Sequence, residues 1–215
     1  MRSLQRTRWL VTTLLLTSLA PAVLLAAERS QPSPLAGRWV NTDLKISSIM
    51  VLYFQPAGKV LNLMPMPQFG ATYQLEGKRL QLTSTAGPLG PDPKPLVLTL
   101  DGEVLRKDGQ PLLGRLKGES PTAPGVGTWR LLEKDSMEQF WTFRSDGEVI
   151  LEVGIRGTYS PKGDTLKLSN RSFTLRRDGD NLYVEGQGKK YRFVRRPWGC
   201  FGLPEEANAS ECRQP

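Results

Sequence analysis

The chain has 215 residues and a formal net charge of +8, from 29 Lys and Arg against 21 Asp and Glu. It contains no histidine, which excludes Ser-His-Asp and Cys-His nucleophile arrangements and most catalytic zinc sites. We therefore expect a protein that is not an enzyme and that holds neither a cofactor nor a metal. An enzyme that works through a carboxylate pair remains an alternative.

The N-terminus has the pattern of a secretory signal peptide. Three arginines precede a leucine-rich apolar segment and a run of small residues. These arginines are Arg2, Arg6 and Arg8. We expect residues 1–27 to be removed, with cleavage after Ala27 or after Ala22. The alternative is retention as an anchor, because residues 9–27 are long enough to cross a bilayer.

Two cysteines, Cys200 and Cys212, lie in a C-terminal tail that spans residues 198–215. In an exported protein the simplest expectation is a disulfide between them, because an oxidising compartment lets the bond persist. Such a bond stabilises the tail by about 3 kcal/mol in the chain-entropy model. The sequence thus predicts a periplasmic or secreted protein that is not an integral membrane protein once the signal peptide is removed.

The chain contains an internal repeat. Gly37-Arg38-Trp39 matches Gly127-Thr128-Trp129, and further matches continue to Leu98-Thr99-Leu100 against Phe173-Thr174-Leu175. The offset between the copies falls from 90 through 89 and 86 to 75, because the first copy holds a Pro- and Gly-rich insertion, residues 86–95. That composition predicts a loop.

Within each copy apolar and polar residues alternate over short runs that end at Gly- and Asp-rich turns. This pattern predicts half-buried antiparallel strands, about eight in each copy. Closure into a barrel removes the sheet edges that would otherwise aggregate. We therefore expect an all-β chain with two tandem up-and-down barrels, residues 34–118 and 127–197, joined by a linker, residues 119–126.

The order of motifs in residues 127–196 resembles the small lipocalin-like domains of exported bacterial proteins. The motifs are G-T-W, F-x-x-x-G, G-T-Y-x-x-x-G-D-x-L-x-L, D-G-D-x-L and Y-x-F-x-x-R, and residues 37–117 follow them more loosely. In lipocalins the first tryptophan closes one end of the barrel, and an arginine from the last strand packs over it. The resemblance implies such pairs between Trp39 and Arg115 and between Trp129 and Arg195.

The two copies differ in their inward-facing residues. Aromatic rings dominate in the second copy, and in so small a barrel they are expected to fill the interior. The first copy is rich in methionine, which adapts to irregular surfaces and ligands. The candidate ligand-binding residues are Met50, Leu52, Leu63, Met64 and Met66, with plain core packing as the alternative.

The excess of positive charge lies in residues 156–196, which hold 11 basic and 4 acidic residues. Alternate positions on neighbouring strands should form a cationic surface that attracts an anionic envelope component or an acidic protein. Its candidate members are Arg171, Arg176, Arg177, Lys189, Lys190, Arg192 and Arg196. Nucleic acid is not expected as a partner, because the chain is exported. The alternative is a solvated face that aids solubility.

Three carboxylates, Glu133, Asp135 and Glu138, are close together in the second copy, and we interpret them as solvated loop residues. The leading hypothesis is a non-enzymatic exported binding protein for a small apolar ligand or a cell-envelope component. The alternative is a protein-interaction module, such as an inhibitor or an envelope assembly factor, that acts through the basic face of the second barrel.

Overall fold

The computed structural model of the protein describes residues 33–42, 51–66, 70–84, 94–117, 123–133, 137–160, 164–201 and 212. These residues form 15 β-strands with antiparallel pairing and no α-helix, which confirms the all-β prediction. The first copy contributes β1 (Gly37–Asn41), β2 (Val51–Phe54), β3 (Lys59–Pro65), β4 (Ala71–Glu76), β5 (Arg79–Ser84), β6 (Leu96–Asp101), β7 (Val104–Lys107) and β8 (Gln110–Arg115). The second copy contributes β9 (Gly127–Leu131), β10 (Glu138–Phe143), β11 (Glu148–Tyr159), β12 (Thr165–Leu168), β13 (Arg171–Asp178), β14 (Asn181–Gly186) and β15 (Lys189–Arg195).

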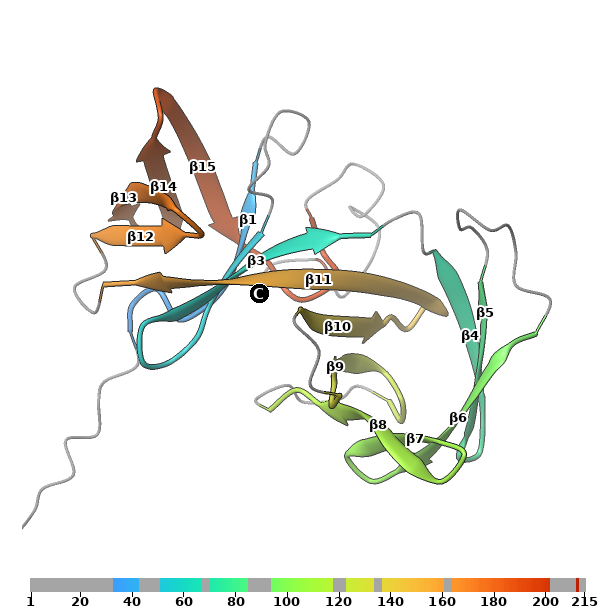
Figure 1. The fold of residues 1–215 in the computed structure, drawn as a ribbon. Helices are drawn as coiled ribbons and strands as arrows, with labels where there is room; N and C mark the ends of the chain where they lie inside the picture. The colour runs from blue at the N-terminus through green and yellow to red at the C-terminus, as the bar shows by residue number, and fades with distance from the viewer. Residues whose placement is uncertain are drawn as a thin grey trace, which may run out of the picture. The chain divides into compact units, whose positions relative to one another are not determined.

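The strands pair into two closed rings that share β11, each with eight members. Ring A consists of β4 to β10 and the N-terminal part of β11, which pairs with both β10 and β4. Ring B consists of β1 to β3, the C-terminal part of β11 and β12 to β15; it closes because β1 pairs with β15 and β11 pairs with β3. Figure 1 shows β11 running from β10 towards β12.

This pairing departs from the tandem arrangement, in which residues 34–118 and residues 127–197 would each close on themselves. The first three strands of each copy instead complete the ring formed by the later strands of the other copy. β1 lies beside β15, and β8 lies beside β9. The expected linker, residues 119–126, therefore joins two neighbouring strands of ring A and does not separate two barrels.

A difference in one connection explains the exchange of strands. The first copy has a connection, residues 66–70, between its third and fourth strands, whereas the matching segments of the second copy run together as the 12-residue strand β11. Val153 and Gly157 of the second copy correspond to Met64 and Ala71 of the first copy. The segment between Val153 and Gly157 is three residues shorter than the segment between Met64 and Ala71. A connection too short to reverse the chain favours strand exchange between two similar units.

The outer faces of strands from both rings meet in an apolar cluster, here called the junction cluster. It combines residues of β1 to β3 in ring B with residues of β10 in ring A and of the C-terminal tail. Its buried members are Val40, Val51, Leu61, Leu63, Phe140 and Phe201, with Tyr53, Leu116, Ile150 and Trp198 packed against them. The burial of both faces of β1 follows from this arrangement.

A buried ion pair between Arg38 of β1 and Glu152 of β11 lies beside the junction cluster. The guanidinium Nη2 and the carboxylate Oε1 are 2.9 Å apart, and the two side chains are 2% and 0% exposed. Arg38 also donates hydrogen bonds to the carbonyl oxygens of Pro197 (2.7 Å) and Cys200 (2.6 Å). The predicted disulfide between Cys200 and Cys212 is confirmed. One buried cation therefore links ring B, the shared strand and the tail.

The described residues belong to one compact unit that spans residues 32–215. The predicted signal peptide and both of its cleavage positions lie outside the described residues, as do most residues of the 86–95 insertion. Within the ranges that the structure describes, no helix has the length and apolar character needed to cross a membrane.

Candidate functional site

One end of ring A is closed by Trp129. The indole is fully buried, and its N–H donates a hydrogen bond to the carbonyl oxygen of Gly125 at 3.1 Å. The guanidinium carbon of Arg115 lies 4.2 Å from the ring centre, and the same side chain donates to the carbonyl oxygen of Val126 and forms an ion pair with Glu103. A cation over an indole face contributes about 0.5–2 kcal/mol, so this group closes the ring and stabilises it.

One end of ring B is closed in the same way by Trp39. Its indole N–H donates to the carbonyl oxygen of Leu35 at 2.8 Å, and the Arg195 guanidinium carbon lies 4.4 Å from the ring centre. Arg195 also donates to the carbonyl oxygen of Pro34. Burial lowers the pKa of the Arg195 guanidinium, and the positive charge of Arg177 lowers it further.

The tryptophan and arginine partners are exchanged relative to the pairs that the lipocalin resemblance implied. Arg195 covers Trp39, and Arg115 covers Trp129, because each arginine ends the strand that pairs with the tryptophan strand of the other copy. An arginine packs over each tryptophan, as the resemblance implied. The partner of each tryptophan is the arginine that had been expected for the other one.

The interiors of the two rings are filled differently. Ring B carries Phe173 and Phe193 where the repeat places Leu98 and Leu113 in ring A. The core of ring B is formed by Leu35, Trp39, Leu52, Phe54, Val60, Tyr159, Leu166, Leu168, Phe173, Leu175, Leu182, Val184 and Phe193. Eight short strands enclose a space just wide enough for side chains, and each ring has its own buried apolar core.

Ring A contains an apolar pocket, here called the mouth pocket, of about 250 Å³. Side chains from β4, β5, β6, β10 and β11 form its wall, and two polar residues, Ser84 and Lys94, stand beside them. The lining consists of Ala71, Leu82, Ser84, Lys94, Leu96, Trp141, Val149 and Leu151. Several of these residues belong to the ring A core or pack against it, so the pocket borders the core.

The mouth pocket lies at the end of ring A opposite the Trp129 closure. Ala71 begins β4, Ser84 ends β5 and Leu96 begins β6, whereas the closed end is marked by Leu75 and Leu80 near Gly125. The insertion of the first copy, residues 86–95, connects β5 to β6 and therefore starts and ends at the mouth. Strand exchange thus places β5 and β6, the strands that flank the insertion of the first copy, at a pocket whose tryptophan comes from the second copy.

Trp141 differs from the two tryptophans that close the rings. Its indole nitrogen is buried and has no hydrogen-bond partner, whereas the N–H groups of Trp39 and Trp129 both donate to backbone carbonyls. A buried polar group without a partner is uncommon and destabilises the fold. The wall of the mouth pocket therefore contains a buried polar group that does not contribute to stability.

The methionine-rich residues that the sequence suggested as a ligand site are not brought together in one cavity of the described region. Leu52 belongs to the ring B core, whereas Leu63 belongs to the junction cluster on the opposite face of the same sheet. Met64 and Met66 are partly buried, and Met50 lies outside the described residues. The mouth pocket was missed because its residues come from both copies.

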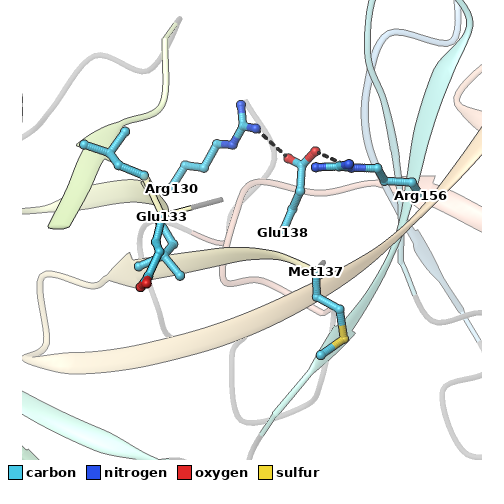
Figure 2. Close-up of a pocket in the computed structure, with 7 residues that line it drawn as sticks. Arg130, Glu133, Met137, Glu138 and Arg156 are labelled. Atoms are coloured by element: carbon cyan, nitrogen blue, oxygen red, sulfur yellow. Dashed lines mark hydrogen bonds and ion pairs between the residues drawn. The ribbon is translucent and has the colours of Figure 1, made fainter. Parts of the chain in front are cut away.

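A second pocket, charged and about 550 Å³ in volume, lies beside β9, β10 and β11. Figure 2 shows Glu138 between Arg130 and Arg156, with nitrogen–oxygen distances of 3.2 and 3.3 Å. Glu138 begins β10 and its side chain is only 10% exposed, so it differs from the solvated loop residue that was expected. Glu133 also lines the pocket, and Asp135 lies outside the described residues. Two carboxylates balance two guanidiniums here.

The basic segment of ring B divides between two faces. The outward residues Arg176, Lys190 and Arg192 surround Tyr183, with Arg176 and Lys190 over its ring at 4.5 and 5.2 Å. Arg171, Arg177 and Lys189 occupy exposed strand ends in register with the inward face, and Arg196 follows β15. The predicted surface is therefore smaller than the charge count suggests. Glu185 and Asp178 also pair with its members.

Comparison of the chain with protein-family models, curated proteins and solved structures found no match. Among the described residues, no group of three or more Cys, Asp or Glu side chains could hold a metal ion.

Proposed function

We propose that this protein is a non-enzymatic, exported binding protein that holds a small apolar ligand in the mouth pocket of ring A. The observation that carries the proposal is the apolar pocket of about 250 Å³ at the open end of a closed ring. Small-molecule sites are concave and mostly apolar, with few polar groups, and this pocket is slightly smaller than their usual size range. The ligand is therefore small, or only part of it enters.

Two features support the exported setting. The predicted signal peptide directs the chain out of the cytoplasm. The disulfide between Cys200 and Cys212 persists in an oxidising compartment. We assign the protein to the periplasm or the extracellular space on these grounds.

The test uses a neutral apolar dye, N-phenylnaphthylamine, whose fluorescence rises on entering an apolar site. We expect saturable binding to the wild-type protein and its loss in the variant Ala71→Phe, because the added ring fills the pocket. Thr72→Phe is the matched control, since Thr72 is the next residue of β4 and lies on the exposed face. Native mass spectrometry of protein purified from its own host should show a bound small molecule. Absence of both dye binding and a native ligand contradicts the proposal.

A second candidate function is interaction with an anionic protein partner through the outward basic face of ring B. It is favoured by the gathering of Arg176, Lys190 and Arg192 around Tyr183 on three neighbouring strands. Capture of a periplasmic protein by the wild type at low salt, but not at high salt and not by the variant with all three cations changed to Gln, supports it. No capture at either salt concentration rejects it.

A further inference from the structure

We infer that the group which enters the mouth pocket is a compact, uncharged aromatic system of one or two fused rings, and not a long alkyl chain. This inference rests on the proposed function, because it names the ligand class of the same pocket. The floor of the pocket and its apolar wall select for such a group.

The mouth pocket has a closed floor inside ring A. Its wall includes Leu82 on β5, Leu96 on β6 and Trp141 on β10. Two positions nearer the closed end, each of these strands places another core residue on the same face: Leu80, Leu98 and Phe143. These three side chains are fully buried, and none of them lines the pocket. A ligand therefore stops at this layer, so the pocket admits a short group and halts a long chain.

Trp141 gives the wall of the pocket an aromatic surface. The side chain lines the pocket, whereas its indole nitrogen is buried. The part of the indole that a ligand meets therefore consists of ring carbons. Aromatic rings meet such a surface in an offset-stacked or edge-to-face arrangement, which adds to the gain from burial. An aromatic ligand should hence bind more tightly than a saturated ligand of the same skeleton.

The rest of the apolar wall limits the charge and the size of the group that enters. It is formed by Ala71, Leu82, Leu96, Val149 and Leu151. An ionised group among these side chains would lose its hydration without gaining a partner, which is strongly unfavourable. An apolar cavity of about 150 Å³ holds one benzene molecule, so a pocket of about 250 Å³ has room for one ring or two fused rings.

The first test measures how far an alkyl chain can enter, with linear alkanols from butanol to decanol and isothermal titration calorimetry. The affinity should rise roughly fourfold with each added methylene while the chain enters the pocket. It should level off before decanol, because the chain has then reached the floor. A rise that continues through decanol overturns the inference.

The second test compares naphthol with decahydronaphthol at neutral pH, where both are uncharged. The two molecules share one carbon skeleton and one hydroxyl group, but only naphthol is aromatic. We expect naphthol to bind the wild type roughly two- to tenfold more tightly. Trp141→Leu should abolish this preference, and Trp141→Phe should retain it. The alkanol series and the naphthol preference are both read on the wild type, so the inference stays testable if Trp141→Leu does not fold.

Tyr183→Leu is the matched control, because it removes an aromatic ring from the outer face of ring B. It should leave the affinities for naphthol and decahydronaphthol unchanged. Equal binding of these two molecules, or a preference that survives Trp141→Leu, overturns the inference and leaves the proposed function standing. Binding of none of the alkanols, neither naphthol compound and no N-phenylnaphthylamine overturns both.

Discussion

Ring A and ring B are built from the same order of strands and are closed by the same pair of side chains, yet their interiors differ. In ring B phenylalanines occupy positions where ring A has leucines, and in ring A an apolar pocket opens at the end opposite the tryptophan. The closed ends match, because in each ring the tryptophan donates to a backbone carbonyl and stacks under an arginine. The open ends are where the two rings diverge.

The comparison shows that a shared framework does not imply a shared function. A ring of eight short strands leaves little interior space, and the two rings fill that space with different side chains. The following predictions test what the rings share and where they differ.

The largest effect is expected when either closing tryptophan is removed. Trp39→Ala and Trp129→Ala should each lower the free energy of unfolding by about 3–5 kcal/mol, because both indoles are fully buried and truncation leaves a cavity. Urea denaturation followed by circular dichroism measures both. A loss below about 1 kcal/mol in one variant would show that the two closed ends are not equivalent.

The next largest effect is expected at the ion pair beside the junction cluster. Glu152→Ala leaves the Arg38 guanidinium buried without its carboxylate, so we expect a loss of about 3 kcal/mol in urea denaturation. The two carbonyl acceptors that remain keep the loss at the low end of the range for broken buried pairs. Glu148→Ala is the control on the same strand; its carboxylate is exposed and Arg144 keeps Asp146 as a second partner, so the loss should be less than about 1 kcal/mol.

Exchanging Leu and Phe between equivalent core positions of the two rings tests whether the empty space in ring A is confined to the mouth pocket. Leu98 is fully buried and does not line the mouth pocket, so Leu98→Phe should overpack the ring and destabilise it by about 1–3 kcal/mol. Phe173→Leu should destabilise ring B by about 1 kcal/mol through the cavity that it leaves. Thermal and urea unfolding measure both. A stabilising effect of Leu98→Phe would show instead that the interior of ring A is hollow beyond the mouth.

A smaller effect tests the strand exchange itself. Double-mutant cycles with Trp→Phe and Arg→Gln changes should give a coupling of about 0.5–2 kcal/mol between Trp39 and Arg195. The coupling between Trp39 and Arg115 should be close to zero, because these residues belong to different rings. The tandem arrangement requires the opposite result.

Most strands could be predicted from the sequence, because each has an inward apolar face whose residues alternate with polar ones. Trp141 with Phe143 and Leu182 with Val184 follow this rule, and their strands are present. The closing tryptophans and the disulfide could also be predicted, since a single residue type at a fixed position identifies them. The choice between ring partners could not, because β8 and β15 carry the same pattern and each is able to pair with β1.

One signal of the strand exchange is nevertheless present in the sequence. The offset between the copies falls by three between Val153 and Gly157, which removes the residues that a turn would need. Arg38 and Glu152 gave no signal, because each occupies an outward position in an alternating strand and would be expected to face water. The mouth pocket likewise depends on residues from both copies, so neither copy alone predicts it.

The smallest effect concerns how much of the basic face of ring B is available to a partner. A hydrogen bond and the positive charge of Lys190 lower the pKa of the Glu185 carboxyl below its ordinary value, with a further contribution from Arg176. A carboxyl with a lowered pKa in the folded state stabilises the fold above its ordinary pKa of 4.5, and this stabilisation is lost as the pH falls through the lowered value.

Lys190→Gln should raise the pKa of Glu185, because it removes the hydrogen bond and the positive charge of Lys190; nuclear magnetic resonance titration of the carboxyl carbon measures this change. Lys189→Gln should not, because Lys189 lies on the opposite face of β15. If Lys190→Gln leaves this pKa unchanged, Lys190 is not engaged by Glu185 in solution, and the cationic surface open to a partner is larger than the paired geometry indicates.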